Sequence, residues 1–525
     1  MPGQEPWWKG AVVYQVYIRS FFDTNGDGQG DLPGVLAKLD YIQSLGIDCL
    51  WLSPVHPSPN RDWGYDISDY EGIQHDYGTM ADFQAVIDGA HQRGLKVILD
   101  EVLCHCSDEH PWFREALDAK SDKADWFVWA DPKPDGTAPN NWLSVFGGPA
   151  WAYRPERRQH YHHKFLRTQP KIDWRNPAAR EACMKVMDFW LEKGVDGFRL
   201  DVANAYLHDP SLTDNPAVEE RYRDDRYWSD ASQMQRRLYE ANNPDNITAL
   251  DEIRRRVEAH GPDRWVFGEF SEEPQRSGAY AAPDEGLHAG YTFNMLLAKT
   301  DSPAFVKANY ATLAAFPRHW PCASFSNHDV PRTAQRFAAS EADRPAVAQL
   351  MLALLLSLKG VALMYMGEEL GLPDGDLRRD QLRDPVGDLY YPDNKGRDGC
   401  RIPIPWTEGA NHGFSSGVPW LPAVPEHNGL SVATQHPDPA STLNVLRRLT
   451  AARKGSGPLK WGDLTFLDLP DPVLGFTRSH AGETVTCLFN MSDAAVDVPA
   501  VGAFILSGGE AGQGTLGPHA WVISR

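Results

Sequence analysis

The sequence predicts an α/β fold: a (β/α)8 TIM barrel with an inserted subdomain after its third strand and an antiparallel β-domain at the C-terminal end. Short apolar segments alternate with segments of helical periodicity, which is the pattern of parallel sheets built from βαβ units. Eight such apolar segments occur between residues 12 and 366, and several end in polar or acidic residues. A doubly wound open sheet is the alternative, since it is built from the same units.

The expected elements follow in order along the chain. Strands are expected at residues 12–17, 49–53, 96–102, 197–202, 265–269, 291–294, 322–327 and 362–366. Helices are expected at residues 32–45, 80–93, 177–193, 251–260 and 344–359. The polar residues near the strand ends are Asp100, His105, Asp201, Glu269, His328, Asp329, Glu368 and Glu369. The carboxyl ends of barrel strands surround one mouth, so these residues are expected to converge there.

Uneven spacing between the strands predicts the domain boundaries. The step from the third to the fourth strand is much longer than the two before it, and it is rich in Trp, Pro, Gly and His. Residues 1–103 and 175–445 are therefore assigned to the barrel, and residues 104–174 to an inserted subdomain B. A second irregular insertion covers about 373–425. Residues 446–525 are expected to form a C-terminal β-sandwich domain.

Composition limits the class of partner. The 525 residues carry a net charge of −20, which argues against nucleic acid or an anionic membrane as the main partner. The first twenty residues lack the features of a signal peptide, and the seven cysteines are scattered. We therefore expect a cytoplasmic protein, monomeric or homo-oligomeric, whose partner is a small molecule.

Residues 197–201, with the sequence GFRLD, place an arginine and an aspartate two positions apart at the end of an expected strand. Residues two apart on a strand face the same side, so Arg199 is expected to lie beside Asp201 and to lower the pKa of that carboxyl. A carboxylate kept ionised in this way is a plausible nucleophile. The alternative is a structural ion pair without a catalytic role.

Several short motifs together carry a resemblance to a known family. In order and spacing, five of them resemble the signature regions of the α-amylase family of retaining glycoside hydrolases: DWGYD at 62–66, DEVLCH at 100–105, GFRLD at 197–201, FGE at 267–269 and SNHD at 326–329. Two more resemble its α-glucosidase and oligo-1,6-glucosidase branch: YMGEE at 365–369 and GRDGCRIPIPW at 396–406. The resemblance extends from residue 7 to roughly the end of the chain.

The resemblance implies which residues carry out the chemistry. Retaining glycoside hydrolysis uses two carboxyl groups, one attacking the anomeric carbon and one protonating the leaving oxygen. Asp201 matches the nucleophile and Glu269 the acid, whose apolar neighbours favour its protonated form. Asp329 matches a third carboxylate that binds sugar hydroxyls and helps to distort the ring. The catalytic residues are therefore expected to be these three acids.

The resemblance also implies substrate-binding residues. His105 and His328 match donors of hydrogen bonds to the sugar, and Arg199 matches the partner of the nucleophile. Asp62 and Arg401 match a pair that closes the pocket beyond the non-reducing glucose, on which Tyr65 would stack. Val202 follows the nucleophile, a position where the branch tends to have valine for α-1,6 bonds and threonine for α-1,4 bonds. Phe146 and Phe165 are expected at the pocket rim, with core packing as the alternative for both.

A loop at residues 23–31, with the sequence DTNGDGQGD, predicts a structural cation. Oxygen-bearing side chains at its first, third and fifth positions and a glycine at the sixth are typical of a Ca²⁺ loop, although the glutamate of an EF-hand is missing at position twelve. The resemblance implies Ca²⁺ or Mg²⁺, with Asp23, Asn25, Asp27 and Asp31 as side-chain ligands and Gln29 through its carbonyl. The alternative is a polar glycine-rich turn without metal.

These expectations combine into one function and three alternatives. The expected protein is an exo-acting retaining α-glucosidase that releases glucose from the non-reducing end of short α-glucosides, with a preference for α-1,6 linkages as in isomaltose. A maltase with α-1,4 preference is one alternative. A transglucosylase or sucrose isomerase is another, because it uses the same glycosyl-enzyme with a different acceptor. A non-catalytic relative is the third, and it would be expected to lack one acid of the pair.

Overall fold

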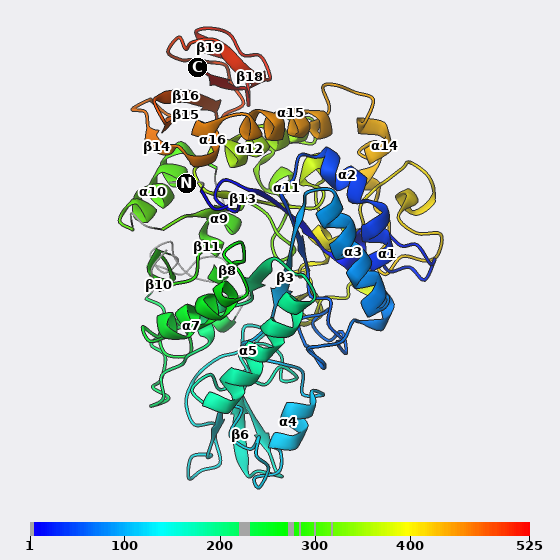
Figure 1. Ribbon diagram of the computed structural model, residues 1–525, viewed down its shortest axis with the longest axis vertical. Coiled ribbons are helices and arrows are strands. Elements are labelled where there is room, and N and C mark those ends of the chain that lie inside the picture. The colour runs from blue at the N-terminus through cyan, green and yellow to red at the C-terminus, as the bar shows by residue number, and fades with distance from the viewer. Residues whose placement is uncertain (1–4, 220–230, 271–277, 283–284, 299–300, 317–318) are drawn as a thin grey trace.

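The computed structural model describes residues 5–219, 231–270, 278–282, 285–298, 301–316 and 319–525 (Figure 1). The barrel occupies the middle of the molecule. The predicted subdomain B and the C-terminal β-sheet lie at opposite ends of the long axis.

Eight parallel strands form one sheet that closes into a barrel. They are β1 (Val12–Val16), β2 (Cys49–Leu52), β3 (Lys96–Glu101), β7 (Gly197–Leu200), β8 (Trp265–Phe270), β11 (Ala289–Thr292), β12 (Cys322–Ala323) and β13 (Val361–Tyr365). Their order is β11-β8-β7-β3-β2-β1-β13-β12, and a parallel bridge between Gly290 and Pro321 joins the two ends. The predicted barrel is confirmed, and the open sheet is wrong.

Two predicted elements differ from the structure for local reasons. The seventh strand, expected at 322–327, ends at Ala323. Beyond it, Ser324 Oγ donates to the carbonyl of Ser326, a local bond that competes with strand pairing. The predicted helix at 32–45 is two helices, because Lys38 between them leaves the helical conformation (φ −107°, ψ 7°).

Helices cover the outside of the barrel (Figure 1). They are α1 (Leu32–Ala37), α2 (Leu39–Ser44), α3 (Met80–Gln92), α5 (Pro177–Glu192), α7 (Asn246–Ala259), α9 (Phe293–Leu296), α10 (Pro303–Ala314), α11 (Thr333–Phe337) and α12 (Arg344–Ser357). Local sequence marks several of their starts: Thr79 and Asp82 form a capping box at α3, and Asn176 caps α5. Helix α12 is buried on nearly all sides because the C-terminal elements pack against its outer face.

Smaller elements lie on both sides of the barrel. Within residues 104–174, α4 (Pro111–Ala116) accompanies an antiparallel sheet of β4 (Trp129–Ala130), β6 (Gln159–His162) and β5 (Trp151–Arg154). The irregular stretch at about 373–425 contains α13 (Pro385–Tyr390). At the C-terminal end, β14 (Asp463–Phe466), β15 (Val473–His480), β16 (Glu483–Asn490), β20 (Trp521–Ser524) and β18 (Phe504–Gly508) form an antiparallel sheet, as predicted. The remaining elements are β9 (Ala281–Ala282), β10 (Glu285–Gly286), β17 (Val496–Asp497), β19 (Thr515–Leu516), α14 (Val432–Gln435), α15 (Thr442–Lys454) and α16 (Gly457–Trp461). The exact domain boundaries stay a prediction.

The structure bears on the cysteines and on membrane-spanning helices. All seven cysteines lie in the described part of the chain, where they are buried and form no disulfide. None of the helices among the described residues combines the length and apolar composition that a membrane span requires. The cytoplasmic location and the oligomeric state stay predictions.

A buried arginine joins the last part of the chain to the barrel. Arg453 on α15 donates through Nε to the carbonyl of Gly10 (3.0 Å), through Nη1 to that of Leu356 (2.6 Å) and through Nη2 to that of Gly360 (2.6 Å). Leu356 lies in the last turn of α12, whose final carbonyls have no partner within the helix. The guanidinium therefore satisfies buried carbonyls from two segments that are distant in sequence, one at Gly10 and one at Leu356 and Gly360.

We expect Arg453→Met to destabilise the protein by about 3 kcal/mol, because each buried carbonyl left without a donor costs about 1–3 kcal/mol. The measurement is the thermal unfolding midpoint by calorimetry. Arg448→Met on the same helix is the control, since Arg448 is exposed and its side chain bonds only the carbonyl of Pro439 among the described residues. Equal midpoints for the two variants would contradict this role of Arg453.

Candidate active site

The carboxyl ends of β3, β7 and β8 bring four buried charged side chains together. Arg199 lies at their centre. Its Nη1 donates to Asp100 Oδ1 (2.6 Å) and Asp201 Oδ1 (2.8 Å), and its Nη2 forms a close ion pair with Glu269. The structure therefore brings the two predicted reacting acids to one guanidinium, together with a third carboxylate.

Strand register produces this cluster. Asp100 on β3 is the register partner of Arg199 on β7, whose partner on β8 is Phe267. Because side chains two residues apart on a strand point the same way, Asp201 shares the side of Arg199, and Glu269 shares the side of Phe267. The convergence predicted from the strand ends follows directly from the parallel pairing.

Arg199 lowers the pKa of Asp201, as expected, but the expected net lowering of that pKa is wrong. Burial raises the pKa of Asp201 to about 7, against the opposing effect of Arg199. Burial also raises the pKa of Glu269 to about 7, again opposed by Arg199. A single guanidinium cannot neutralise three buried carboxylates, so the two acids are better described as a coupled pair that titrates near neutral pH.

Two further groups hold Glu269. The hydroxyl of Tyr291 donates to its Oε1 (2.8 Å), and the backbone N–H of Val202 donates to its Oε2 (3.3 Å). Tyr291 on β11 is the register partner of Glu269, so its position in the sheet explains the contact. Sequence reasoning placed Tyr291 on a strand but missed it as a site residue, because the register between the two strands was unknown.

Val202 has an unusual backbone conformation. Its φ of 45° and ψ of 44° lie in the left-handed region, which β-branched residues rarely adopt. It is buried and connects Asp201 to the short 3₁₀ turn Ala203–Ala205. This conformation is part of the geometry that directs its N–H toward Glu269.

Asp329 lies beside two arginines and a histidine. Arg401 Nη2 and Arg397 Nη1 donate to its Oδ1 at 3.0 and 3.1 Å, and His328 Nε2 lies 3.3 Å from its Oδ2. Burial opposes ionisation, but His328, Arg397 and Arg401 together hold the pKa of Asp329 well below its usual range. The third predicted acid is therefore ionised at neutral pH, unlike the coupled pair.

The expected pair of Asp62 with Arg401 is replaced by a different pair. Asp62 Oδ1 accepts from Arg397 Nη2 (2.7 Å), whereas Arg401 bonds Asp329. Gln169 Nε2 donates to the other oxygen of Asp62 (2.9 Å). Both arginines occur in the motif GRDGCR at 396–401, and the sequence could not decide between them because that segment makes an irregular turn.

Tyr65 and the two predicted histidines form a buried layer. The Tyr65 ring stacks on that of His328, with centroids 5.1 Å apart, and its hydroxyl donates to Asp100 Oδ2 (2.9 Å). His105 Nε2 donates to the carbonyl of Tyr65 (3.0 Å). Burial lowers the pKa of His328 to about 3, so this ring is neutral. The predicted contacts of all three with a sugar stay predictions.

Phe146 and Phe165 come from the predicted subdomain B and reach the same region. The guanidinium of Arg397 lies 5.3 Å from the Phe146 ring centroid. Phe165 lies 5.8 Å from Phe146 and 5.2 Å from His105, measured between ring centroids. The structure brings both rings to the residues predicted to bind substrate, and their role as rim platforms stays a prediction.

The predicted cation loop folds through its own side-chain oxygens. Asp23 Oδ1 accepts from the backbone N–H groups of Asn25 and Gly26, and its Oδ2 accepts from Ser415 Oγ (2.5 Å). Asp31 caps α1 through Gly34. Among the described residues, no group of three or more His, Cys, Asp or Glu side chains is arranged to hold a metal ion. The oxygen donor set itself suits a hard cation, and the metal stays a proposal.

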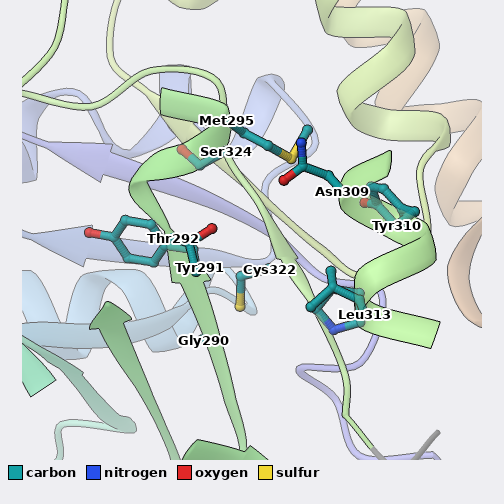
Figure 2. A pocket seen from close by; sticks show the side chains of 10 residues that line it. Gly290, Tyr291, Thr292, Met295, Asn309, Tyr310, Leu313, Cys322 and Ser324 are labelled. Carbon is teal, nitrogen blue, oxygen red and sulfur yellow. The ribbon is translucent and has the colours of Figure 1, made fainter. Parts of the chain in front are cut away.

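One small cavity lies near this site, on the other side of Tyr291. Figure 2 shows it between β11, β12 and α10, with Tyr291, Asn309 and Cys322 among its lining residues. Its volume of about 20 Å³ is enough for roughly one water molecule. A sugar ring does not fit there, so this cavity is not the substrate pocket.

Comparison with known proteins identifies the family. The family described as "Alpha amylase, catalytic domain" matches residues 15–462. The chain is 46% identical to a probable alpha-glucosidase of Rhizobium meliloti, over 93% of this chain and 90% of that protein. It is 34% identical to the oligo-1,6-glucosidase of Parageobacillus thermoglucosidasius, over 93% and 91% of the two chains.

Solved structures agree over nearly the whole chain. The crystal structure of the alpha-glucosyl transfer enzyme XgtA superposes with a TM-score of 0.94 at 41% identity, covering 99% of this chain and 100% of that one. The trehalulose synthase MutB from Pseudomonas mesoacidophila superposes with a TM-score of 0.90 at 30% identity, covering 99% of both chains. Together with the ordered motifs and the closed barrel, these matches show that the chain belongs to the α-amylase family of glycoside hydrolases.

Proposed function

We propose that the protein is an exo-acting retaining α-glucosidase that releases glucose from the non-reducing end of short α-glucosides and prefers α-1,6 linkages. The observation that carries the proposal is the convergence of Asp201 and Glu269 on Arg199 at neighbouring strand ends. Two carboxyl groups at one mouth are what a glycosidase of this kind requires.

The two acids divide the chemistry between them. Asp201 attacks the anomeric carbon while Glu269 gives its proton to the leaving glycosidic oxygen, so the C–O bond to the leaving group breaks as the bond to Asp201 forms. Glu269 then takes a proton from water, and that water displaces Asp201 from the sugar. Burial raises the pKa of both acids to about 7, which favours a state near neutral pH in which Glu269 keeps a proton while Asp201 is ionised.

Contacts around Asp62 support exo attack. Arg397 connects Asp62, in the segment after β2, to Asp329, in the segment after β12. Phe146 lies against the same guanidinium. A link of this kind across one side of the mouth favours a pocket that accepts only the terminal sugar, and therefore the release of one glucose at a time.

Two observations support the proposed linkage preference: the side chain of Val202 and the name of one relative. The Val202 side chain lies next to the proposed nucleophile and has no hydroxyl to offer to a sugar next to the cleaved bond. The relative from Parageobacillus thermoglucosidasius is named an oligo-1,6-glucosidase. Both observations favour isomaltose over maltose.

Glucosyl transfer is the second candidate function. It is supported by the solved relatives named as an alpha-glucosyl transfer enzyme and a trehalulose synthase. The same glycosyl-enzyme serves hydrolysis and transfer, since water and a sugar hydroxyl compete for one intermediate. The products distinguish the two.

We also propose that a Ca²⁺ or Mg²⁺ ion stabilises the loop at residues 23–31. Asp23, Asn25, Asp27, Gln29 and Asp31 supply oxygen donors, and three of them carry negative charge. Asp23 also bonds Ser415 of the irregular insertion. An ion bound here would strengthen the contact between two segments distant in sequence.

We expect the protein to release glucose from isomaltose with a higher kcat/KM than from maltose, and to leave sucrose without isomerisation. The measurement is product analysis by chromatography for the three sugars. Asp201→Asn is the inactive control, expected to lose at least about 1000-fold in kcat while remaining folded. Near-normal turnover in that variant would rule out Asp201 as nucleophile. Sugar isomers or longer glucans without free glucose would establish transfer instead.

We expect a bell-shaped dependence of kcat/KM on pH with its maximum near 7. Below that pH both acids of the coupled pair become protonated and the nucleophile is lost, whereas above it both ionise and the proton donor is lost. Glu269→Gln acting on α-glucosyl fluoride, whose leaving group needs no proton, should lose the alkaline decline. A constant kcat/KM between pH 5 and 9 would contradict the description of one protonated and one ionised acid.

We expect EDTA to lower the thermal unfolding midpoint. A bound ion whose free concentration is 100 times its Kd stabilises the folded state by about 2.7 kcal/mol, and EDTA removes this contribution. Added Ca²⁺ or Mg²⁺ should restore the midpoint. Asp27→Asn should abolish the response to EDTA, whereas Asp40→Asn, at an exposed acid paired with Arg93, should keep it. An unchanged midpoint for the wild type in EDTA would leave the loop as a turn without metal.

A further inference from the structure

Asp384 is a fully buried carboxylate in the irregular insertion, far in sequence from the strand ends that carry the acids. It caps the short helix α13, where its Oδ1 accepts from the N–H of Val386 at 3.4 Å. This contact is long for a hydrogen bond and does not account for burying a charge. Its stronger contacts are with Arg397.

Asp384 accepts two hydrogen bonds from the guanidinium of Arg397. Arg397 Nε donates to Asp384 Oδ2 (3.0 Å), and Arg397 Nη2 donates to Asp384 Oδ1 (2.7 Å). A two-point contact of this kind fixes the plane of the guanidinium as well as its charge. The backbone N–H of Arg397 also donates to Oδ2 (2.5 Å). Both the chain and the side chain of Arg397 are therefore attached to this carboxylate.

The opposite side of the guanidinium faces the predicted substrate-binding acids. Nη1 donates to Asp329 at 3.1 Å, and Nη2 donates to Asp62 at 2.7 Å. An arginine side chain has many rotamers, so two acids on separate loops do not by themselves fix its orientation. Asp384 supplies the third contact, and its two-point geometry leaves Nη1 and part of Nη2 for the other acids.

The surrounding backbone is built to hold Asp384 close to Arg397. Asp398 Oδ2 accepts from the backbone N–H groups of Arg383 (2.5 Å) and Asp384 (2.8 Å). Gly396 has a positive φ of 72°, and a Cβ there would lie only 2.5 Å from Asp384 Oδ2. The same Cβ would lie 2.7 Å from the backbone nitrogen of Gly387, so a side chain at position 396 would displace the carboxylate and also this backbone segment. The segment around residue 384 and the segment around residue 397 are therefore joined by hydrogen bonds in both directions.

We propose that Asp384 is a positioning residue that aims Arg397 at Asp62 and Asp329 and thereby sets the affinity of the pocket for a terminal glucose. The inference rests on the proposed function, since it assigns those two acids to glucose binding. Asp384 touches no reacting atom, so its effect is on binding of the ring more than on proton transfer. The insertion thus contributes to substrate affinity through a residue placed behind the site.

The test is Asp384→Asn, with glucose binding measured by titration calorimetry and turnover measured on p-nitrophenyl α-glucopyranoside. We expect the Kd for glucose and the KM each to rise about tenfold, with a smaller fall in kcat, as is usual when a partner that orients a binding residue is removed. Gly396→Ala, which displaces the same carboxylate by contact, should have the same effect. Arg397→Lys should also raise KM, and combining it with Asp384→Asn should add little, because both act through one contact.

Asp380→Asn is the matched control. Asp380 lies in the same insertion and pairs with Arg378, but both side chains are 70% exposed, so KM should not change. A folded Asp384→Asn protein with unchanged glucose Kd and KM would overturn the proposal, as would a lowered unfolding midpoint as its only effect. If Asp384→Asn does not fold, Gly396→Ala and Arg397→Lys decide by the same readings. Turnover failing on every α-glucoside would defeat the proposed function alone, whereas absence of glucose binding to the wild type would overturn both.

Discussion

The geometry of the site depends on one buried guanidinium shared by three carboxylates. Arg199 contacts Asp100, Asp201 and Glu269, which come from three consecutive strands of the barrel. A buried charge requires partners, and removing any one of them changes the balance of the others. Burial raises the pKa of Asp201 and of Glu269 to about 7, so the one positive charge does not offset the cost of burying three ionised acids. The chemistry proposed for the site needs one protonated acid beside one ionised acid. The excess of carboxyl groups over positive charge around Arg199 favours that state.

Much of this cluster could be predicted from the sequence, because parallel strand pairing translates sequence position into place. The eight apolar segments predicted the barrel, and the acids that follow them were expected at one mouth, where Asp201 and Glu269 indeed meet. What failed was the electrostatic detail. The spacing within residues 197–201 pairs Arg199 with Asp201 alone, whereas the register also places Asp100 beside Arg199 and Tyr291 beside Glu269. The sequence does not show which residues of two neighbouring strands lie side by side when those strands are far apart along the chain.

The second arginine cluster shows where prediction from sequence stops. Arg397 and Arg401 lie four residues apart in one irregular turn, and only the fold shows that Arg397 bonds Asp62 while both bond Asp329. These residues come from loops, whose conformations depend on local hydrogen bonds instead of a repeating pattern. Gln169 was missed for the same reason, since it reaches Asp62 from the predicted subdomain B. The barrel provides fixed strand ends, and the loops decide how the side of the mouth is closed.

Val202 lies where the end of strand β7 passes into the following loop. A β-branched residue in the left-handed region costs on the order of 1–3 kcal/mol, and such strain persists only where the surrounding structure imposes it. Here the strained residue follows Asp201 directly and donates its N–H to Glu269. Its backbone therefore links the position of Asp201 to that of Glu269, while its side chain occupies the position that the family resemblance associates with linkage. A substitution at this residue changes the side chain next to Asp201 and also the ease with which the backbone keeps its left-handed turn. The proposed linkage preference and the position of Glu269 therefore depend on the same residue.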